Sequence, residues 1–162
     1  LGRPPATVSG MSKEAKSYMQ LALDQAERAG AAGEVPVGAV LVESFSGKIV
    51  AAAGNQVEGL NDPTAHAEML VLRLGGQRLC APRLPGCDLY VTLEPCPMCA
   101  QAISIARLRR LYFGAFDPKG GGVDHGPKIF ATSSCRHVPE VYGGIEEKAS
   151  ASLLRAFFSE RR

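Results

Sequence analysis

Two short motifs in this sequence carry residue types that bind metals. His66 is followed two residues later by Glu68, and Cys96 and Cys99 are separated by two residues. Cys96 stands at the start of a predicted helix and Cys99 about one turn later, so both sulfur atoms can point to one spot. One imidazole and two thiolates suit Zn²⁺, and three protein ligands leave one coordination position for water. The pattern therefore predicts a catalytic zinc, with one ion per subunit.

The carboxylate of Glu68 would lie beside this metal without ligating it. Zinc lowers the pKa of a bound water to about 7, which provides hydroxide at neutral pH. A neighbouring carboxylate can take a proton from that water and return it to a ring nitrogen and a leaving amine. We therefore expect Glu68 to be the catalytic proton carrier.

Simpler interpretations exist for each part of the pattern. A Cys-x-x-Cys pair alone is typical of a redox pair or of half a structural zinc site. Cys80, Cys87, Cys96 and Cys99 could together form a four-cysteine site. A single histidine such as His66 near a helix start is often a cap or a core residue. The joint pattern is more specific than its parts and favours catalysis.

The other cysteines and histidines show no ligand spacing. Cys80, Cys87 and Cys135 are expected to be buried apolar fillers. His125 and His137 are expected to be loop or surface residues.

The elements that must position these residues follow from hydrophobic periodicity and from turn residues. A glycine pair, Gly75-Gly76, should end the helix that carries Glu68. The residues from 116 to 126 form a glycine-rich loop. The pattern predicts helices over 12–29, 65–74, 97–107 and 146–158, and strands over 35–42, 48–53, 89–93, 110–115 and, as a strand or a loop, 136–142. This order indicates an α/β layered fold.

The composition is that of an ordinary globular protein. The chain has 162 residues, 46% of them hydrophobic and 21% charged, with a net charge of +2. These values argue for one domain and exclude collagen, coiled coil and disorder. Residues 1–10 are expected to be a disordered leader or remnant, and residues 11–162 a single zinc-dependent domain. No apolar run long enough for a membrane helix is present.

Five cysteines, an odd number, include the Cys-x-x-Cys pair. This usage favours a cytoplasmic metal protein over a secreted disulfide framework.

From about Ser17 to Arg162 the chain resembles the bacterial tRNA adenosine deaminase (TadA) family of the cytidine deaminase-like superfamily. Zinc deaminases of nucleobases share the signature formed by His66, Glu68, Cys96 and Cys99. The resemblance rests on Glu34-Val35-Pro36-Val37-Gly38-Ala39-Val40, Gly54-Asn55, Asp62-Pro63-Thr64-Ala65-His66-Ala67-Glu68, Leu93-Glu94-Pro95-Cys96-Pro97-Met98-Cys99-Ala100, Phe113-Gly114-Ala115, Asp117-Pro118-Lys119, and Phe157-Phe158 ahead of Arg161-Arg162. The full string from Asp62 to Glu68 and the last three motifs indicate the tRNA branch.

The resemblance implies a three-layer α/β/α fold with a central mixed sheet flanked by helices, and a homodimer. It implies hydrolytic conversion of the wobble adenosine of a tRNA anticodon to inosine, with an arginine tRNA as the expected partner. Zinc-bound hydroxide would attack the flipped base while Glu68 carries protons. His66, Cys96 and Cys99 would bind the zinc.

The resemblance also assigns the substrate contacts. Asn55 would contact the base, and Pro36 and Val37 would form an apolar wall against it. Asp117 would contact the flanking nucleotides, and Lys119, Arg161 and Arg162 are candidates for phosphate contacts.

Plainer roles remain open for all of them: turn residues for Asn55 and Asp117, strand core for Pro36 and Val37, and solvated ends for the cations. In the basic run of Arg107, Arg109 and Arg110, about half of the side chains are expected to be solvated surface, and the rest could line an RNA groove. Base stacking would use Phe116, Phe157 or Phe158, although the last two fit a helix core better.

Two departures from the family pattern weaken assignments in the last third of the chain. Residues 120–126 carry extra glycine, and residues 134–139 replace the more usual Asn-His-x-Val-Glu-Val. The zinc motifs are unaffected by either departure.

Two other functions fit the same residues. Deamination of a free nucleobase or nucleoside, of the guanine or cytosine type, would use the same zinc chemistry but would not need Asp117, Lys119 or the basic C-terminal end. A non-catalytic, zinc-stabilised RNA-binding module would make Glu68 incidental.

Overall fold

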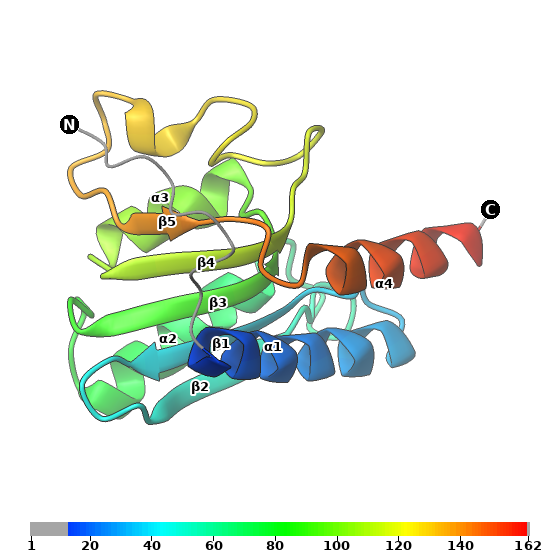
Figure 1. Ribbon diagram of the computed structural model, residues 1–162, viewed down its shortest axis with the longest axis horizontal. Coiled ribbons are helices and arrows are strands. Elements are labelled where there is room, and N and C mark those ends of the chain that lie inside the picture. The colour runs from blue at the N-terminus through cyan, green and yellow to red at the C-terminus, as the bar shows by residue number, and fades with distance from the viewer. Residues whose placement is uncertain (1–12, 162) are drawn as a thin grey trace.

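The computed structural model describes residues 13–161, which form a mixed five-stranded sheet with helices on both faces (Figure 1). The predicted leader, residues 1–10, and Arg162 lie outside the described residues. The strands are β1 (Gly38–Glu43), β2 (Ile49–Gly54), β3 (Cys87–Leu93), β4 (Arg110–Ala115) and β5 (Glu140–Tyr142). The helices are α1 (Lys13–Ala31), α2 (Ala67–Leu79), α3 (Pro97–Ile105) and α4 (Glu147–Ser159), with a 3₁₀ turn, η2 (Ile129–Ala131).

The strands lie in the order β2-β1-β3-β4-β5. Strand β1 runs antiparallel to β2 and β3, whereas β3, β4 and β5 are parallel to one another. Helices α1 and α4 pack on one face of the sheet and α2 and α3 on the other. The predicted three-layer α/β/α fold with a central mixed sheet is therefore confirmed. In residues 13–161 no helix is both long and apolar enough to cross a membrane.

Helix α1 lies close on the β1–β2 hairpin because two paired glycines face it. Gly38 and Gly54 are opposite each other in the register of the hairpin. A Cβ atom on Gly38 would overlap the backbone carbonyl oxygen of Ala22, and one on Gly54 would lie 2.7 Å from the carbonyl oxygen of Gln25. The absence of both side chains therefore sets the distance between helix and sheet.

Helix α2 continues through the glycine pair that was predicted to end it. Gly75 packs against the sheet, where an added Cβ would clash with the Leu41 side chain. The helix runs on to Leu79 and ends at Cys80, which adopts the left-handed conformation (φ 52°). The prediction was wrong because close packing against β1 uses the small size of glycine and outweighs its low helix propensity.

Two strand boundaries also differ from the prediction. Strand β1 begins at Gly38 instead of residue 35, because the Val37 N–H turns back to the carbonyl of Val35 at 2.8 Å. Only Glu140–Tyr142 of the predicted 136–142 segment forms a strand.

Gly38→Ala should destabilise the protein, because the new methyl group must push α1 away from the hairpin. We expect the free energy of unfolding in urea to fall by about 1–3 kcal/mol or more. Gly86→Ala is the matched control, since a Cβ on Gly86 meets no atom within 4 Å. Equal stabilities for the two variants would contradict this account of the packing.

Candidate metal centre and active site

The first residues of helices α2 and α3 meet at one edge of the sheet. His66 is the N-cap of α2 and Cys96 the N-cap of α3, and both have extended backbones (ψ 149° and 169°). Pro97 occupies the first turn of α3, where its missing N–H costs no helical hydrogen bond. Cys99 lies one turn further along and is fully buried. Both helix starts thus direct metal-binding atoms toward the same point.

The distances among these side chains fit a zinc ion. The Nδ1 atom of His66 lies 3.6 Å from the sulfur of Cys96 and 3.5 Å from the sulfur of Cys99. Ligand bonds of zinc in tetrahedral geometry place nitrogen and sulfur about 3.6 Å apart. The three ligand atoms all lie within 4.8 Å of one another. His66, Cys96 and Cys99 can therefore hold a zinc ion, and three protein ligands would leave a fourth coordination position open.

Hydrogen bonds within this group already favour a thiolate. The Cys99 thiol lowers the pKa of Cys96 to about 4, with help from His66 and against the effect of burial. The same contact and burial raise the pKa of Cys99, and the contact with Cys96 raises the pKa of His66. Because the thiolate is the metal-binding form, the site holds Cys96 ready for zinc.

Glu68 lies in the first turn of α2 and is almost completely buried. Burial raises the pKa of its carboxyl group, and the Cys96 charge raises it further. A carboxyl group with a raised pKa accepts and releases protons closer to neutral pH than an exposed one. The position and environment of Glu68 therefore suit proton transfer beside the metal.

A cavity of about 600 Å³ lies over the metal site. A volume of this size is typical of pockets for small ligands and can hold a nucleoside. His66, Glu68 and Cys96 contribute to its floor. Its remaining lining comes from Gly33, Glu34, Val35, Val37, Asn55, Val57, Glu58, Leu93, Glu94, Asp117, Gly120, Phe157 and Arg161.

Asn55 lines this cavity and also fixes the start of α2. Its Oδ1 atom accepts a hydrogen bond of 2.8 Å from the Ala67 N–H, one of the helix-start donors that has no partner within the helix. Its backbone N–H donates to the carbonyl of Val37. The side-chain amide group provides N–H donors besides. Asn55 can thus position the ligand histidine and present donors to a base.

The other residues with predicted substrate contacts separate into two groups. Val37 and Asp117 line the cavity, whereas Pro36 is buried beside Val37 and is not part of the lining. The Asp117 carboxylate accepts hydrogen bonds from the backbone N–H groups of Lys119 and Gly120, so it also closes its own turn.

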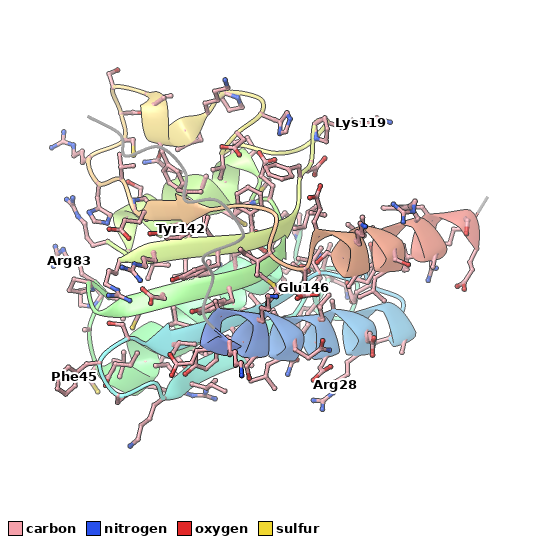
Figure 2. The ribbon with its side chains drawn as sticks, in the orientation of Figure 1. Arg28, Phe45, Arg83, Lys119, Tyr142 and Glu146 are labelled. Atoms are coloured by element: carbon pink, nitrogen blue, oxygen red, sulfur yellow. The ribbon has the colours of Figure 1, made fainter. Side chains whose placement is uncertain are left out.

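Helix α4 supplies the far wall of the cavity. Phe157, a residue of this helix, is buried, and the Arg161 guanidinium lies 3.4 Å from the centre of the Phe157 ring. Arg161 also donates to the Phe157 carbonyl, which holds it beside the cavity. Lys119 is exposed on the loop after β4, at the same end of the molecule as α4 (Figure 2).

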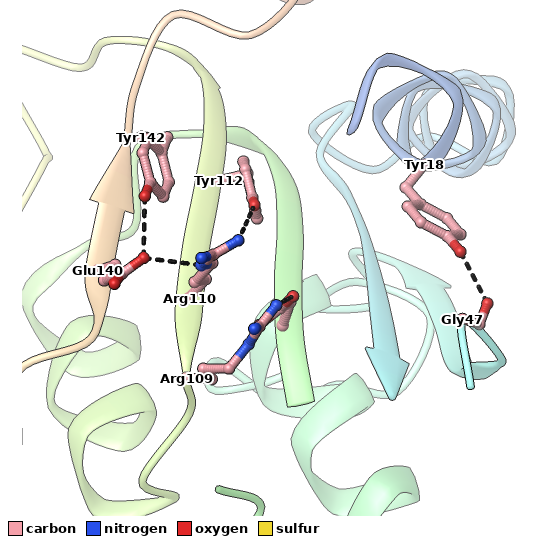
Figure 3. Close-up of polar contacts among 8 residues, drawn as sticks. Tyr18, Gly47, Arg109, Arg110, Tyr112, Glu140 and Tyr142 are labelled. Carbon is pink, nitrogen blue, oxygen red and sulfur yellow. Dashed lines mark hydrogen bonds and ion pairs between the residues drawn. The ribbon is translucent and has the colours of Figure 1, made fainter. Parts of the chain in front are cut away.

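The basic run is engaged in structural ion pairs. Arg109 binds the buried Asp88 with two hydrogen bonds, and Arg110 pairs with Glu140 at 2.7 Å (Figure 3). The guanidinium of Arg110 also lies near the Tyr142 ring. Arg109 and Arg110 thus connect neighbouring strands, and Arg107 donates to the Arg136 carbonyl at 3.2 Å. A role of the run in RNA binding stays a prediction.

The remaining cysteines do not form a second metal cluster among residues 13–161. Cys87 is buried, as predicted, but Cys80 is exposed and Cys135 is half-buried, so the expectation of buried fillers was wrong for these two. Cys80 is exposed because it ends α2 in a left-handed conformation.

Sequence reasoning missed the roles of two buried acids and one histidine around the cavity. Glu34 accepts hydrogen bonds from the backbone N–H groups of Glu58 and Gly59. His125 lies in a loop, as expected, and its Nδ1 lies 2.8 Å from the carboxylate of Glu94, a contact that its spacing did not indicate. One sequence feature could have identified the two acids. Each is a single acidic residue directly beside an apolar strand, and a carboxylate is buried in such a place only when it has hydrogen-bond partners.

In this three-layer α/β/α domain, two convergent helix starts supply one histidine and two cysteines. This combination defines the class of zinc-binding deaminases. Residues 12–115 match the family model described as the cytidine and deoxycytidylate deaminase zinc-binding region. The chain is 54% identical to the tRNA-specific adenosine deaminase of Agrobacterium fabrum, over 92% of this chain and 97% of that protein. The chain belongs to the tRNA-specific adenosine deaminase family.

Solved structures resemble the fold closely. One comes from a study of A-to-I editing by tRNA:A34 deaminases at the wobble position of transfer RNA. It matches with a TM-score of 0.83 and 54% identity, over 85% of this chain and 99% of that chain. A guanine deaminase from Bacillus subtilis matches with a TM-score of 0.60 and 39% identity, over 65% of this chain and 66% of that chain.

Cys99→Ala should remove bound zinc, because two ligands from α2 and α3 cannot hold the ion as tightly as three. We expect metal analysis of the purified protein to give about one zinc per wild-type chain and close to none for the variant. Cys135→Ala is the control, since Cys135 is half-buried but lies outside the ligand group. Full zinc content in Cys99→Ala would contradict the assigned ligand set.

Proposed function

We propose that this protein catalyses the hydrolytic deamination of adenosine to inosine at the wobble position of a tRNA anticodon loop. Water adds to the adenine ring carbon that bears the amino group, and ammonia leaves. The observation that carries the proposal is that the cavity over the metal site adjoins a second hollow of about 1050 Å³. The two share the lining residues Val35, Leu93, Asp117, Gly120 and Arg161.

This second hollow has the chemistry of a single-stranded RNA surface. Lys119 and Arg155 supply positive charge, and Phe116 and Phe158 expose aromatic surface. Single-stranded nucleic acids bind to such combinations of cations and aromatic rings. A free base would fill the first cavity and would not reach the second.

The residues of the cavity have separate tasks in this reaction. Zinc, when bound by His66, Cys96 and Cys99, supplies Lewis-acid activation of water. Glu68 takes one proton from the attacking water and donates it to the ring nitrogen. It then takes the second proton from the added hydroxyl group and donates it to the departing amine, which leaves as ammonia. Asn55 presents amide donors to the base edge, and Val37 covers the apolar side of the ring.

Three finer features belong to the same proposal. The substrate is an arginine tRNA, and the enzyme acts in the cytoplasm as a homodimer, as its family resemblance implies. Exposed apolar side chains support an interface: Ile105 is 65% exposed and Val138 57% exposed. The two segments are adjacent, since Ser104 donates to the His137 carbonyl at 2.7 Å.

Light scattering during size-exclusion chromatography should give twice the chain mass, because the protein is proposed to be a homodimer. A monomer mass would refute the dimer.

The substrate is tested by offering the zinc-loaded protein an arginine tRNA anticodon stem-loop, free adenosine, guanine and cytosine, with products identified by mass. We expect inosine in the stem-loop and no product from the free compounds, because only the stem-loop occupies both hollows. Turnover of guanine alone would instead place the protein with enzymes acting on free bases, and absence of any turnover would favour a binding module.

Replacing Glu68 by Gln should separate chemistry from metal binding. The amide cannot carry the proton, and loss of a general acid–base group typically lowers the rate about 10²–10⁴-fold. Because Glu68 is not a ligand, the zinc content should stay at the wild-type level. Stem-loop turnover and metal analysis on the same preparation check both expectations, and unchanged turnover would show that Glu68 has another role.

A further inference from the structure

The buried carboxylate of Glu94 holds a single loop through five hydrogen bonds. Its Oε1 atom accepts from the Asp117 N–H at 3.0 Å and lies 2.8 Å from His125 Nδ1. Its Oε2 atom accepts from the backbone N–H groups of Val123, Asp124 and His125, at 3.2, 3.0 and 3.1 Å. All of these donors belong to residues 117–125, which we call the substrate loop. The Glu94 side chain has no exposed surface.

Glu94 is also part of the turn that leads into the metal ligand Cys96, which we call the ligand turn. Glu94 follows β3 directly and precedes Cys96 by two residues. Its own N–H donates to the Ala115 carbonyl at 2.8 Å, and the Gly122 N–H donates to the Pro95 carbonyl at 2.8 Å. The substrate loop is therefore fixed to the ligand turn at several points, with the carboxylate at their centre.

The substrate loop in turn forms one wall of the active site. Asp117 and Gly120 line the cavity over the metal and also the adjoining hollow. Lys119, between them, lines the adjoining hollow. The position of this wall relative to the metal ligands therefore depends on the hydrogen bonds that converge on the Glu94 side chain.

We propose that Glu94 is a positioning residue that fixes the substrate loop against the metal-ligand turn and so sets the affinity for the nucleotides around the target base. The effect on substrate affinity rests on the proposed function, whereas the fixing of the loop against the ligand turn does not. Glu94 is not one of the three ligand residues, and although it lines the cavity, its carboxylate oxygens are engaged by the substrate loop. Its effect reaches the substrate through Asp117, Lys119 and Gly120.

Glu94→Gln keeps the size of the side chain but leaves a single acceptor oxygen. That oxygen can serve the donors at only one of the two carboxylate positions, so the others lose their acceptor. Buried N–H groups without acceptors are unfavourable, and the loop should open more often. We expect hydrogen–deuterium exchange of peptides covering 117–125 to become about tenfold faster or more, with zinc content unchanged.

Asp88→Asn is the matched control. Asp88 is also a buried carboxylate, 4% exposed, but it lies near the start of β3, at the end away from Glu94, and binds Arg109. This variant should lower the free energy of unfolding without faster exchange in 117–125. Equal exchange in Glu94→Gln and wild type, or the same increase in Asp88→Asn, would overturn the positioning role.

Kinetics with the stem-loop give the second readout. In Glu94→Gln we expect KM to rise about tenfold and kcat to change much less, because a displaced wall weakens binding while Glu68 and the metal ligands stay in place. Asp88→Asn should retain the wild-type KM. An unchanged KM in Glu94→Gln would overturn the link to substrate. If the wild-type protein does not deaminate the stem-loop, the proposed function fails, while the exchange experiment still decides the role of Glu94.

Discussion

The convergence of two helix starts at one edge of the sheet is the constraint on which the rest of the site depends. A zinc site tolerates only small errors in ligand position, and its ligands come from α2 and α3, which are separate in sequence. Their relative position is set by the sheet: Gly75 lets α2 approach β1, and Asn55 binds the first N–H of α2 from the end of β2. The chemistry at His66 and Cys96 thus depends on packing well away from the metal.

Three buried glutamates surround the cavity, and their surroundings give each a different role. Glu68 is buried beside the ligands, and burial raises its pKa, which suits a group that exchanges protons. Burial acts in the same direction on Glu94, but hydrogen bonds from Asp117, His125 and neighbouring backbone groups outweigh it and lower its pKa, which suits a permanent acceptor. Glu34 also accepts backbone N–H groups and holds the loop that contains Glu58 and Gly59. One residue type thus supplies both the proposed proton carrier and two loop anchors.

Local patterns predicted the helices, the strands and the metal ligands, because these depend on periodicity and on residues close in sequence. The errors arose where distant contacts decide. Gly75 continues a helix because Leu41 lies against it, and Arg109 is held by Asp88 from another strand. His125 has no local partner spacing and meets Glu94 only through the fold. A single sequence does not reveal such pairs, since nothing in their own neighbourhood marks them.

The site therefore consists of a floor and walls that are stabilised by different means. The floor is made of helix starts packed on the sheet, where a displaced residue would disturb the core. Helix α4 supplies one wall and loops supply the others, and these loops are held by carboxylates that accept backbone N–H groups irrespective of the loop side chains. Side chains such as Lys119 can then change without loss of these anchors. In the proposed function, the residues of the floor would carry out the chemistry, while the loops of the walls would contact the nucleotides around the target base through a backbone that these anchors hold.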